Sequence, residues 1–129
     1  MSILPEQDDR GSAPVEFLLV GLVLTFLTLA ILQLALAVYL RNVAHDAAVE
    51  GAYHGALADI TPEEGAARAE LVAERVVGDG FISRAVAERI ESPAGDEVEV
   101  TLWTTMPLLG LWGIPDGWEV TARAPAASW

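Results

Sequence analysis

An uncharged apolar run from Phe17 to Leu40 limits most strongly what this chain can fold into. As a helix, its 24 residues would extend about 36 Å, enough to cross a hydrocarbon layer of about 30 Å with some tilt. The remaining chain is too small to cover such a helix on every side, so we expect a membrane span. A cleaved secretory signal cut after Ala37 is an alternative, although this run is longer than the usual apolar region of a signal.

Charge is kept away from this run. The 129 residues carry a formal net charge of -12, and all seven basic residues are arginine. An acidic surface repels phosphate, so we expect no nucleic-acid partner. Arg10 and Arg41 flank the run on its two sides and leave the orientation open on charge alone. Because there is no cysteine, disulfides and thiolate metal sites are excluded.

Beyond the run, the sequence predicts a small α+β domain. The helix should continue to Leu57, and Thr61, Pro62 and Glu64 predict the start of a second helix through a capping box. We expect its apolar stripe to include Ala67, Leu71, Val72, Val76 and Val77, with Arg75 beside it, and residues 78–80 to end the helix.

A short helix or turn is expected over residues 81–91. The alternation in residues 97–105 then predicts a half-buried strand with Val98, Val100 and Leu102 inward. Residues 117–125 predict a second strand with Trp118, Val120 and Ala122 on one face, while residues 106–116 contain too much proline and glycine for regular structure. The domain at residues 58–129 should therefore pair a helix with a C-terminal β-hairpin, or a slightly larger sheet, and end in a flexible tail.

No constellation of catalytic residues is recognisable, so we expect neither an enzyme nor a cofactor. His45 and His54 lie nine residues apart and so on roughly opposite helix faces, which argues against a shared metal ion. The apolar residues Leu108, Leu109, Leu111, Trp112 and Ile114 either close the small core or form a docking patch for a partner or the bilayer. Within the span, Gly21, Thr25 and Thr28 make one smooth face and Gln33 adds an amide, a pattern that favours close helix packing in lipid.

The stretch "RGSAPVEF" resembles the type IVb prepilin motif, in which a glycine precedes the cleavage point and glutamate is the fifth mature residue. With the hydrophobic helix and the small acidic domain, the chain is similar to the TadE-like minor pilins of the tight-adherence (Tad/Flp) pilus system. The resemblance implies a charged leader at residues 1–11, cut by a prepilin peptidase between Gly11 and Ser12. It also implies a transmembrane and extended helix over residues 12–57, with the span at about 17–40.

In related filaments the glutamate, here Glu16 followed by Phe17, pairs with the N-terminal amine of a neighbouring subunit. Such a buried pair would fix the axial register, whereas a glutamate at the headgroup level would only favour the positive helix N-terminus. The implied partners are membrane lipid, the peptidase, other pilin subunits and the assembly platform. The implied location is the cell membrane, with one span and the acidic domain outside. The main alternative is a single-pass membrane protein whose outer domain binds an extracellular partner through the Trp-rich loop.

Overall fold

The computed structural model describes residues 11–108 and 112–127 of the chain. Contacts divide the chain into two compact units, Met1–Leu34 (unit 1) and Ala35–Trp129 (unit 2). A long helix, α1 (Ser12–Gly55), contributes to both units. Apart from Gly11, the described part of unit 1 consists of α1 alone, and its large apolar side chains are exposed.

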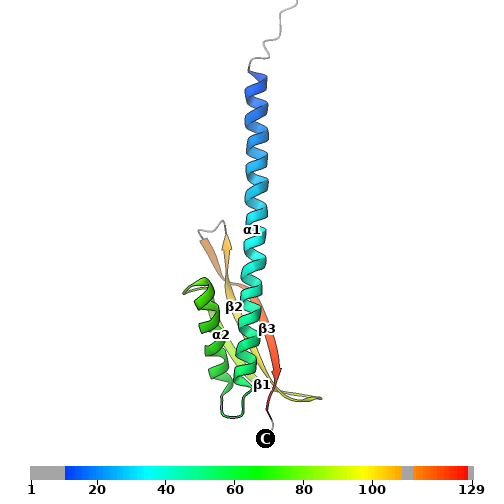
Figure 1. Ribbon diagram of the computed structural model, residues 1–129, viewed down its shortest axis with the longest axis vertical. Helices are drawn as coiled ribbons and strands as arrows, with labels where there is room; N and C mark the ends of the chain where they lie inside the picture. The colour runs from blue at the N-terminus through cyan, green and yellow to red at the C-terminus, as the bar shows by residue number, and fades with distance from the viewer. Residues whose placement is uncertain (1–10, 109–111, 128–129) are drawn as a thin grey trace, which may run out of the picture. The chain divides into compact units, whose positions relative to one another are not determined.

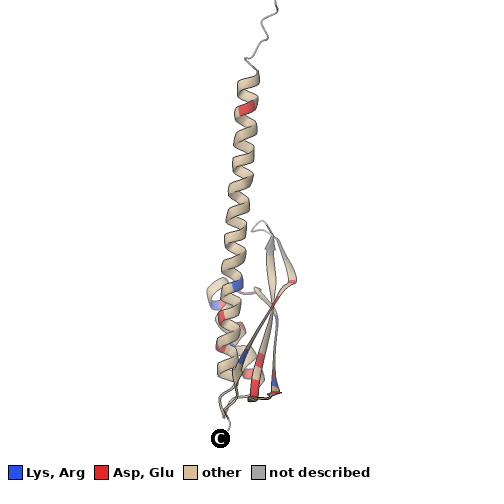
Figure 2. Cartoon of the chain, turned by 90° about the vertical axis from the view of Figure 1, so that its right-hand side faces the viewer, with Lys and Arg blue, Asp and Glu red and all other residues tan. Residues whose placement is uncertain are grey.

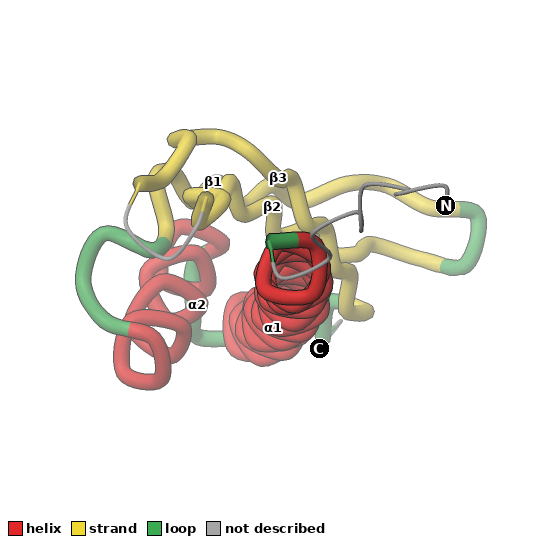
Figure 3. Tube along the Cα trace, turned by 90° about the horizontal axis from the view of Figure 1, so that it is seen from above, coloured by secondary structure: helices red, strands yellow, loops and turns green. Residues whose placement is uncertain are grey.

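Unit 2 is an α+β domain, as the sequence predicts. It combines the second part of α1 with α2 (Pro62–Val77) and an antiparallel sheet in the order β1-β2-β3. The strands are β1 (Ile82–Ser92), β2 (Gly95–Leu108) and β3 (Trp112–Pro125). Within this unit the two helices lie side by side and cover one face of the sheet (Figures 1 and 3).

The predicted start and end of α2 are confirmed. Thr61 Oγ1 accepts a hydrogen bond from the Glu64 backbone N–H at 3.3 Å, and Glu64 Oε2 accepts one from the Thr61 N–H at 2.8 Å. Pro62 occupies the first helical position, where its missing N–H has no intrahelical role. The helix stops at Gly78, whose φ of 118° lies in a region that side chains rarely adopt.

The predicted apolar stripe of α2 is wrong. Leu71 and Val76 are 43% and 54% exposed, and Ala67 is also exposed. The buried face consists of small residues, Gly65, Ala66, Ala69 and Ala73, with Val72 only partly buried beside them. The reason is a close approach of the two helices: a Cβ placed on Gly51 of α1 would lie 2.6 Å from the Ala69 Cβ. Larger residues on this face would hold the helices apart.

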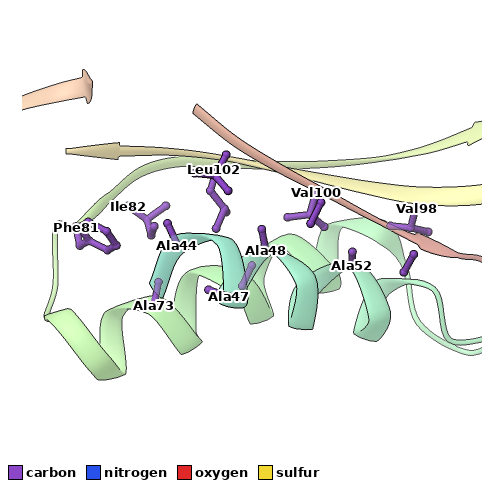
Figure 4. Close-up of a cluster of buried hydrophobic side chains, with 14 of the residues drawn as sticks. Ala44, Ala47, Ala48, Ala52, Ala73, Phe81, Ile82, Val98, Val100 and Leu102 are labelled. Carbon is purple, nitrogen blue, oxygen red and sulfur yellow. The ribbon is translucent and has the colours of Figure 1, made fainter. Parts of the chain in front are cut away.

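The alternation predicted for residues 97–105 is confirmed. Val98, Val100 and Leu102 of β2 are fully buried and face α1 (Figure 4). In β3, Val120 and Ala122 are buried and Trp118 packs against the same core, as predicted. On the helical side the core consists largely of alanine: Ala44, Ala47, Ala48 and Ala52, all fully buried. Short side chains let the sheet lie close to α1 and α2.

The short helix or turn expected over residues 81–91 is a strand instead. β1 pairs along its length with β2, from Ile82 opposite Thr104 to Ser92 opposite Gly95. Ala85 and Ala87 point toward the core while Arg84 and Glu88 are exposed. Alanine and charged residues are poor strand formers, so the local sequence does not predict a strand here. Pairing with the strongly alternating β2 overrides that preference.

The segment at residues 106–116 is more regular than predicted. Met106 pairs with Ile114, Pro107 with Gly113 and Leu108 with Trp112. These pairs lie beyond the last β1 partner on β2, Thr104, so β2 is an edge there on one side, where proline is tolerated. A register shift between Thr104 and Met106 accompanies the change.

The expected flexible tail is also partly ordered. β3 extends to Pro125, and the Ala126 and Ala127 N–H groups donate to Asp96 and Ala56 carbonyls at 2.8 and 2.9 Å. The C-terminal segment therefore ties the β1–β2 end of the sheet to the end of α1.

Candidate membrane and assembly site

The apolar surface of unit 1 surrounds the helix on all sides. Phe17, Leu18 and Leu19 are 78%, 68% and 59% exposed, and successive residues of a helix point about 100° apart around its axis. A helix with this surface would expose a large apolar area to water unless lipid or other helices cover it. Among the described residues, α1 is the one helix long and apolar enough to cross a membrane. After Glu16, no charged residue appears along α1 until Arg41 (Figure 2).

Glu16 lies just beyond the first turn of α1. It is exposed and makes no ion pair or hydrogen bond within the part of the chain that the structure describes. The favourable interaction of a carboxylate with a helix N-terminus falls off within the first turn. Phe17 beside it is 78% exposed, and the role of both residues in assembly stays a prediction.

Gly11 directly precedes α1, which begins at Ser12. A Cβ added to Gly11 would meet no atom within 4 Å. Its φ is not positive. Among the described glycines, positive φ values occur at Gly78, Gly80 and Gly95. Neither packing nor backbone conformation within the described chain requires glycine at this position.

The small-residue face of unit 1 is formed by Gly21, Thr25 and Thr28, and its two hydroxyl groups are hydrogen-bonded. The Thr25 hydroxyl donates to the Gly21 carbonyl at 2.7 Å and the Thr28 hydroxyl to the Leu24 carbonyl at 2.8 Å. Both threonine hydroxyls are therefore satisfied by the helix backbone itself. Gln33, the fourth predicted packing residue, is half-buried. The role of this face in helix packing stays a prediction.

The remaining predicted positions are scattered. Leu109 and Leu111 lie outside the described residues, and Leu108 and Trp112 are described by their backbone pairing alone. His45 is exposed and His54 half-buried, and the described residues hold no group of three or more potential metal ligands. Glu50, four residues before His54, instead pairs with Arg68 Nη2 at 2.7 Å.

Sequence reasoning missed the glycines that join α1 to α2. A Cβ on Gly65 would lie 2.6 Å from the Gly51 carbonyl oxygen and 2.8 Å from the Gly55 Cα. Taken alone, Gly51 and Gly55 predict only a weaker end of α1, because glycine is a poor helix former. Their four-residue spacing, repeated by Gly65 and Ala69, is the small-residue pattern that permits close helix contact, and it was the available signal.

Comparison with known proteins gave a family match for the N-terminal part of the chain. Residues 11–52 match the family model TadE, described as TadE-like protein. The match begins at Gly11 and covers most of α1, but it includes neither α2 nor the sheet. The comparison with curated proteins gave no match, and neither did the comparison with solved structures. Over residues 11–52 this chain is therefore TadE-like, which confirms the resemblance carried by "RGSAPVEF" and associates the protein with the Tad pilus system.

Proposed function

We propose that this protein is a minor pilin or pseudopilin that acts in assembly of a Tad/Flp-type pilus or a related secretion apparatus, and that it is not an enzyme. The observation that carries the proposal is the TadE-like match, which starts at Gly11 and covers an exposed apolar helix. The helix would anchor the protein in the membrane by one span, with unit 2 outside the cytoplasm. Other pilin subunits and the assembly platform would be its protein partners.

Processing between Gly11 and Ser12 is supported by the setting of Gly11. Since the described chain has no use of its own for glycine there, an external requirement is the better explanation. A residue without a side chain lets the backbone enter a narrow protease site in extended form. Cleavage would leave a new amino terminus on Ser12, the first residue of α1.

Assembly through Glu16 is supported by its exposure and its distance from the helix start. A free amine on Ser12 of a neighbouring subunit would supply the opposite charge that Glu16 lacks among the described residues. In the low dielectric of packed helices such a pair would set the axial register, because leaving one of its members unpaired costs about 3–5 kcal/mol. Phe17 would add apolar contact next to the pair.

Mass spectrometry of the mature N-terminus tests the processing step. In cells that carry the matching prepilin peptidase, we expect a chain that begins at Ser12, with or without an N-methyl group. A Gly11→Val variant should keep its leader, whereas Gly21→Ala, which changes a glycine in open space, should be cut normally. Wild-type protein that keeps Met1 would contradict the proposal and favour a plain single-pass membrane protein. A chain that starts near Val38 would indicate a secretory signal instead.

A further inference from the structure

We propose that unit 2 rests directly on the lipid surface at the end where α1 enters it, with the paired ends of β2 and β3 in the interfacial layer. The residues that define this lipid-facing end are Val38 and Tyr39 of α1 with Met106 and Ile114 of the sheet. The inference depends on the membrane span in the proposed function, but not on cleavage or on a role in a pilus.

The length of the apolar run sets where the chain leaves the bilayer. Phe17 to Leu34 contains 18 residues, or about 27 Å of helix, close to the hydrocarbon thickness of about 30 Å. The run continues to Leu40, yet Leu36 and Leu40 pack in the protein core of unit 2. The last turns of the run are therefore covered in part by the domain itself, and the hydrocarbon boundary falls close to Ala35.

The outward residues on these turns suit an interface. Val38 and Tyr39 are 52% and 53% exposed, although Leu36 and Leu40 beside them are covered. Tyrosine is enriched where the hydrocarbon meets the headgroups, because its ring is apolar and its hydroxyl is polar. Because Leu40 is buried and Leu36 partly buried in the core of unit 2, the domain begins within the apolar run and not after a bare stretch of helix.

The sheet reaches the same level as these turns. Leu102 of β2 lies across from Ala44 of α1, and the two elements run side by side (Figure 4). From Leu102 to Met106, β2 advances about 13 Å, which corresponds to about nine residues of α1 and leads back to about Ala35. Met106 pairs there with Ile114, which is 48% exposed. Figure 1 shows this end of β2 and β3 beside α1, beyond the start of β1.

The distribution of acidic residues on the sheet also supports the proposed lipid contact. Five carboxylates lie toward the opposite end of the sheet, where β1 turns into β2: Glu88, Glu91, Asp96, Glu97 and Glu99, of which Glu99 is paired with Arg123. A membrane surface that carries anionic lipids repels such groups. Most acids of the sheet therefore lie away from the proposed contact, and Asp116, the acid nearest to Ile114, accepts a hydrogen bond from the Ser83 hydroxyl.

Site-specific fluorescence tests the proposal, and the absence of cysteine makes single labels simple. An environment-sensitive nitrobenzoxadiazole label would be attached to the full chain at Ile114→Cys, at Leu57→Cys or at Leu27→Cys. The proteins would be reconstituted in phosphatidylcholine vesicles that carry spin-labelled lipid. Leu57, 52% exposed against 48% for Ile114, is the matched control because it follows the far end of α1.

We expect shallow spin-labelled lipid to quench the Ile114 label several-fold more than the Leu57 label, and aqueous iodide to do the reverse. Deep spin-labelled lipid should quench the Leu27 label. Equal quenching at Ile114 and Leu57 would overturn the proposal. So would an Ile114 label shielded from iodide but not quenched by lipid, which would indicate a protein contact. A Leu27 label beyond the reach of lipid would overturn the membrane span as well as the docking.

Discussion

Glu16 is the residue whose charge matters most to the proposed assembly. We expect Glu16→Gln to be cleaved after Gly11 as the wild type is, because the Gly11–Ser12 bond does not involve the altered side chain. The variant should fail to enter pili or pilus-associated assemblies, since an amide cannot balance the amine of a neighbouring Ser12. The amount of each variant in the sheared assembly fraction, relative to membranes, measures this. Glu63→Gln, which removes an exposed acid on α2, should behave as wild type. Normal incorporation of Glu16→Gln would leave Glu16 with a headgroup role alone.

Gly51 tests the contact between α1 and α2. A Cβ there would lie 2.6 Å from both the Ala69 Cβ and the Gly65 carbonyl oxygen, neither of which is the end of a flexible side chain. Overpacking costs about 1–3 kcal/mol, and the better helix preference of alanine offsets up to about 1 kcal/mol of it. We therefore expect Gly51→Ala to lower the free energy of unfolding of unit 2 by up to about 2 kcal/mol. Denaturant titration in detergent, followed by tryptophan fluorescence, measures the change.

Gly21→Ala is the matched control for Gly51→Ala. It alters the same helix, but its Cβ meets no atom within 4 Å. The stability of unit 2 should not change. If both substitutions had the same effect, the close contact of Gly51 with α2 would not limit the packing.

Among the elements, α2 depends on a local start signal because its buried face offers little apolar area. The reciprocal hydrogen bonds of Thr61 and Glu64 hold its first turn. Replacing an N-cap threonine with alanine costs about 0.5–2 kcal/mol. We expect Thr61→Ala to destabilise unit 2 within that range, as measured by its thermal unfolding midpoint. Thr61→Asp restores a cap acceptor and should stay close to wild type. A loss of equal size in both variants would point to packing rather than capping.

The elements also show which parts of the fold the sequence could predict. β2 was predictable because Val98, Val100 and Leu102 alternate with polar residues, and the start of α2 because Thr61 and Glu64 have capping-box spacing. β1 was not, since Ala85 and Ala87 carry little signal and become inward residues only through pairing with β2. The buried face of α2 was wrong for a related reason: its packing selects small residues over apolar ones. Of the candidate site, the motif at Gly11 and Glu16 was legible, whereas the contact of Gly51 with Gly65 required the fold.

At the scale of the whole molecule, one helix serves two environments. Its first part presents apolar side chains outward, while from Leu36 onward one side faces the domain core and from Arg41 onward the other side is polar. The change from lipid-facing to domain-facing surface thus occurs within the apolar run, not at its charged end, Arg41. Hydropathy alone does not separate the two parts, because Leu36 and Leu40 are as apolar as the residues before them.

This division predicts where unit 2 can be separated from the apolar first part of α1. A chain that begins at Ala35 should fold, because it retains the whole of unit 2. A chain that begins at Arg41 lacks Leu36 and Leu40, of which Leu40 is 6% exposed in the core. Loss of a buried leucine costs about 2–5 kcal/mol, so the shorter chain should unfold at markedly lower denaturant concentration in tryptophan fluorescence. The full chain with Leu40→Ala should lose a similar amount, which separates the effect of the side chain from that of a new helix end. Equal stability of the two shortened chains would mean that the core of unit 2 begins after Leu40, and that Leu36 and Leu40 belong to the membrane span.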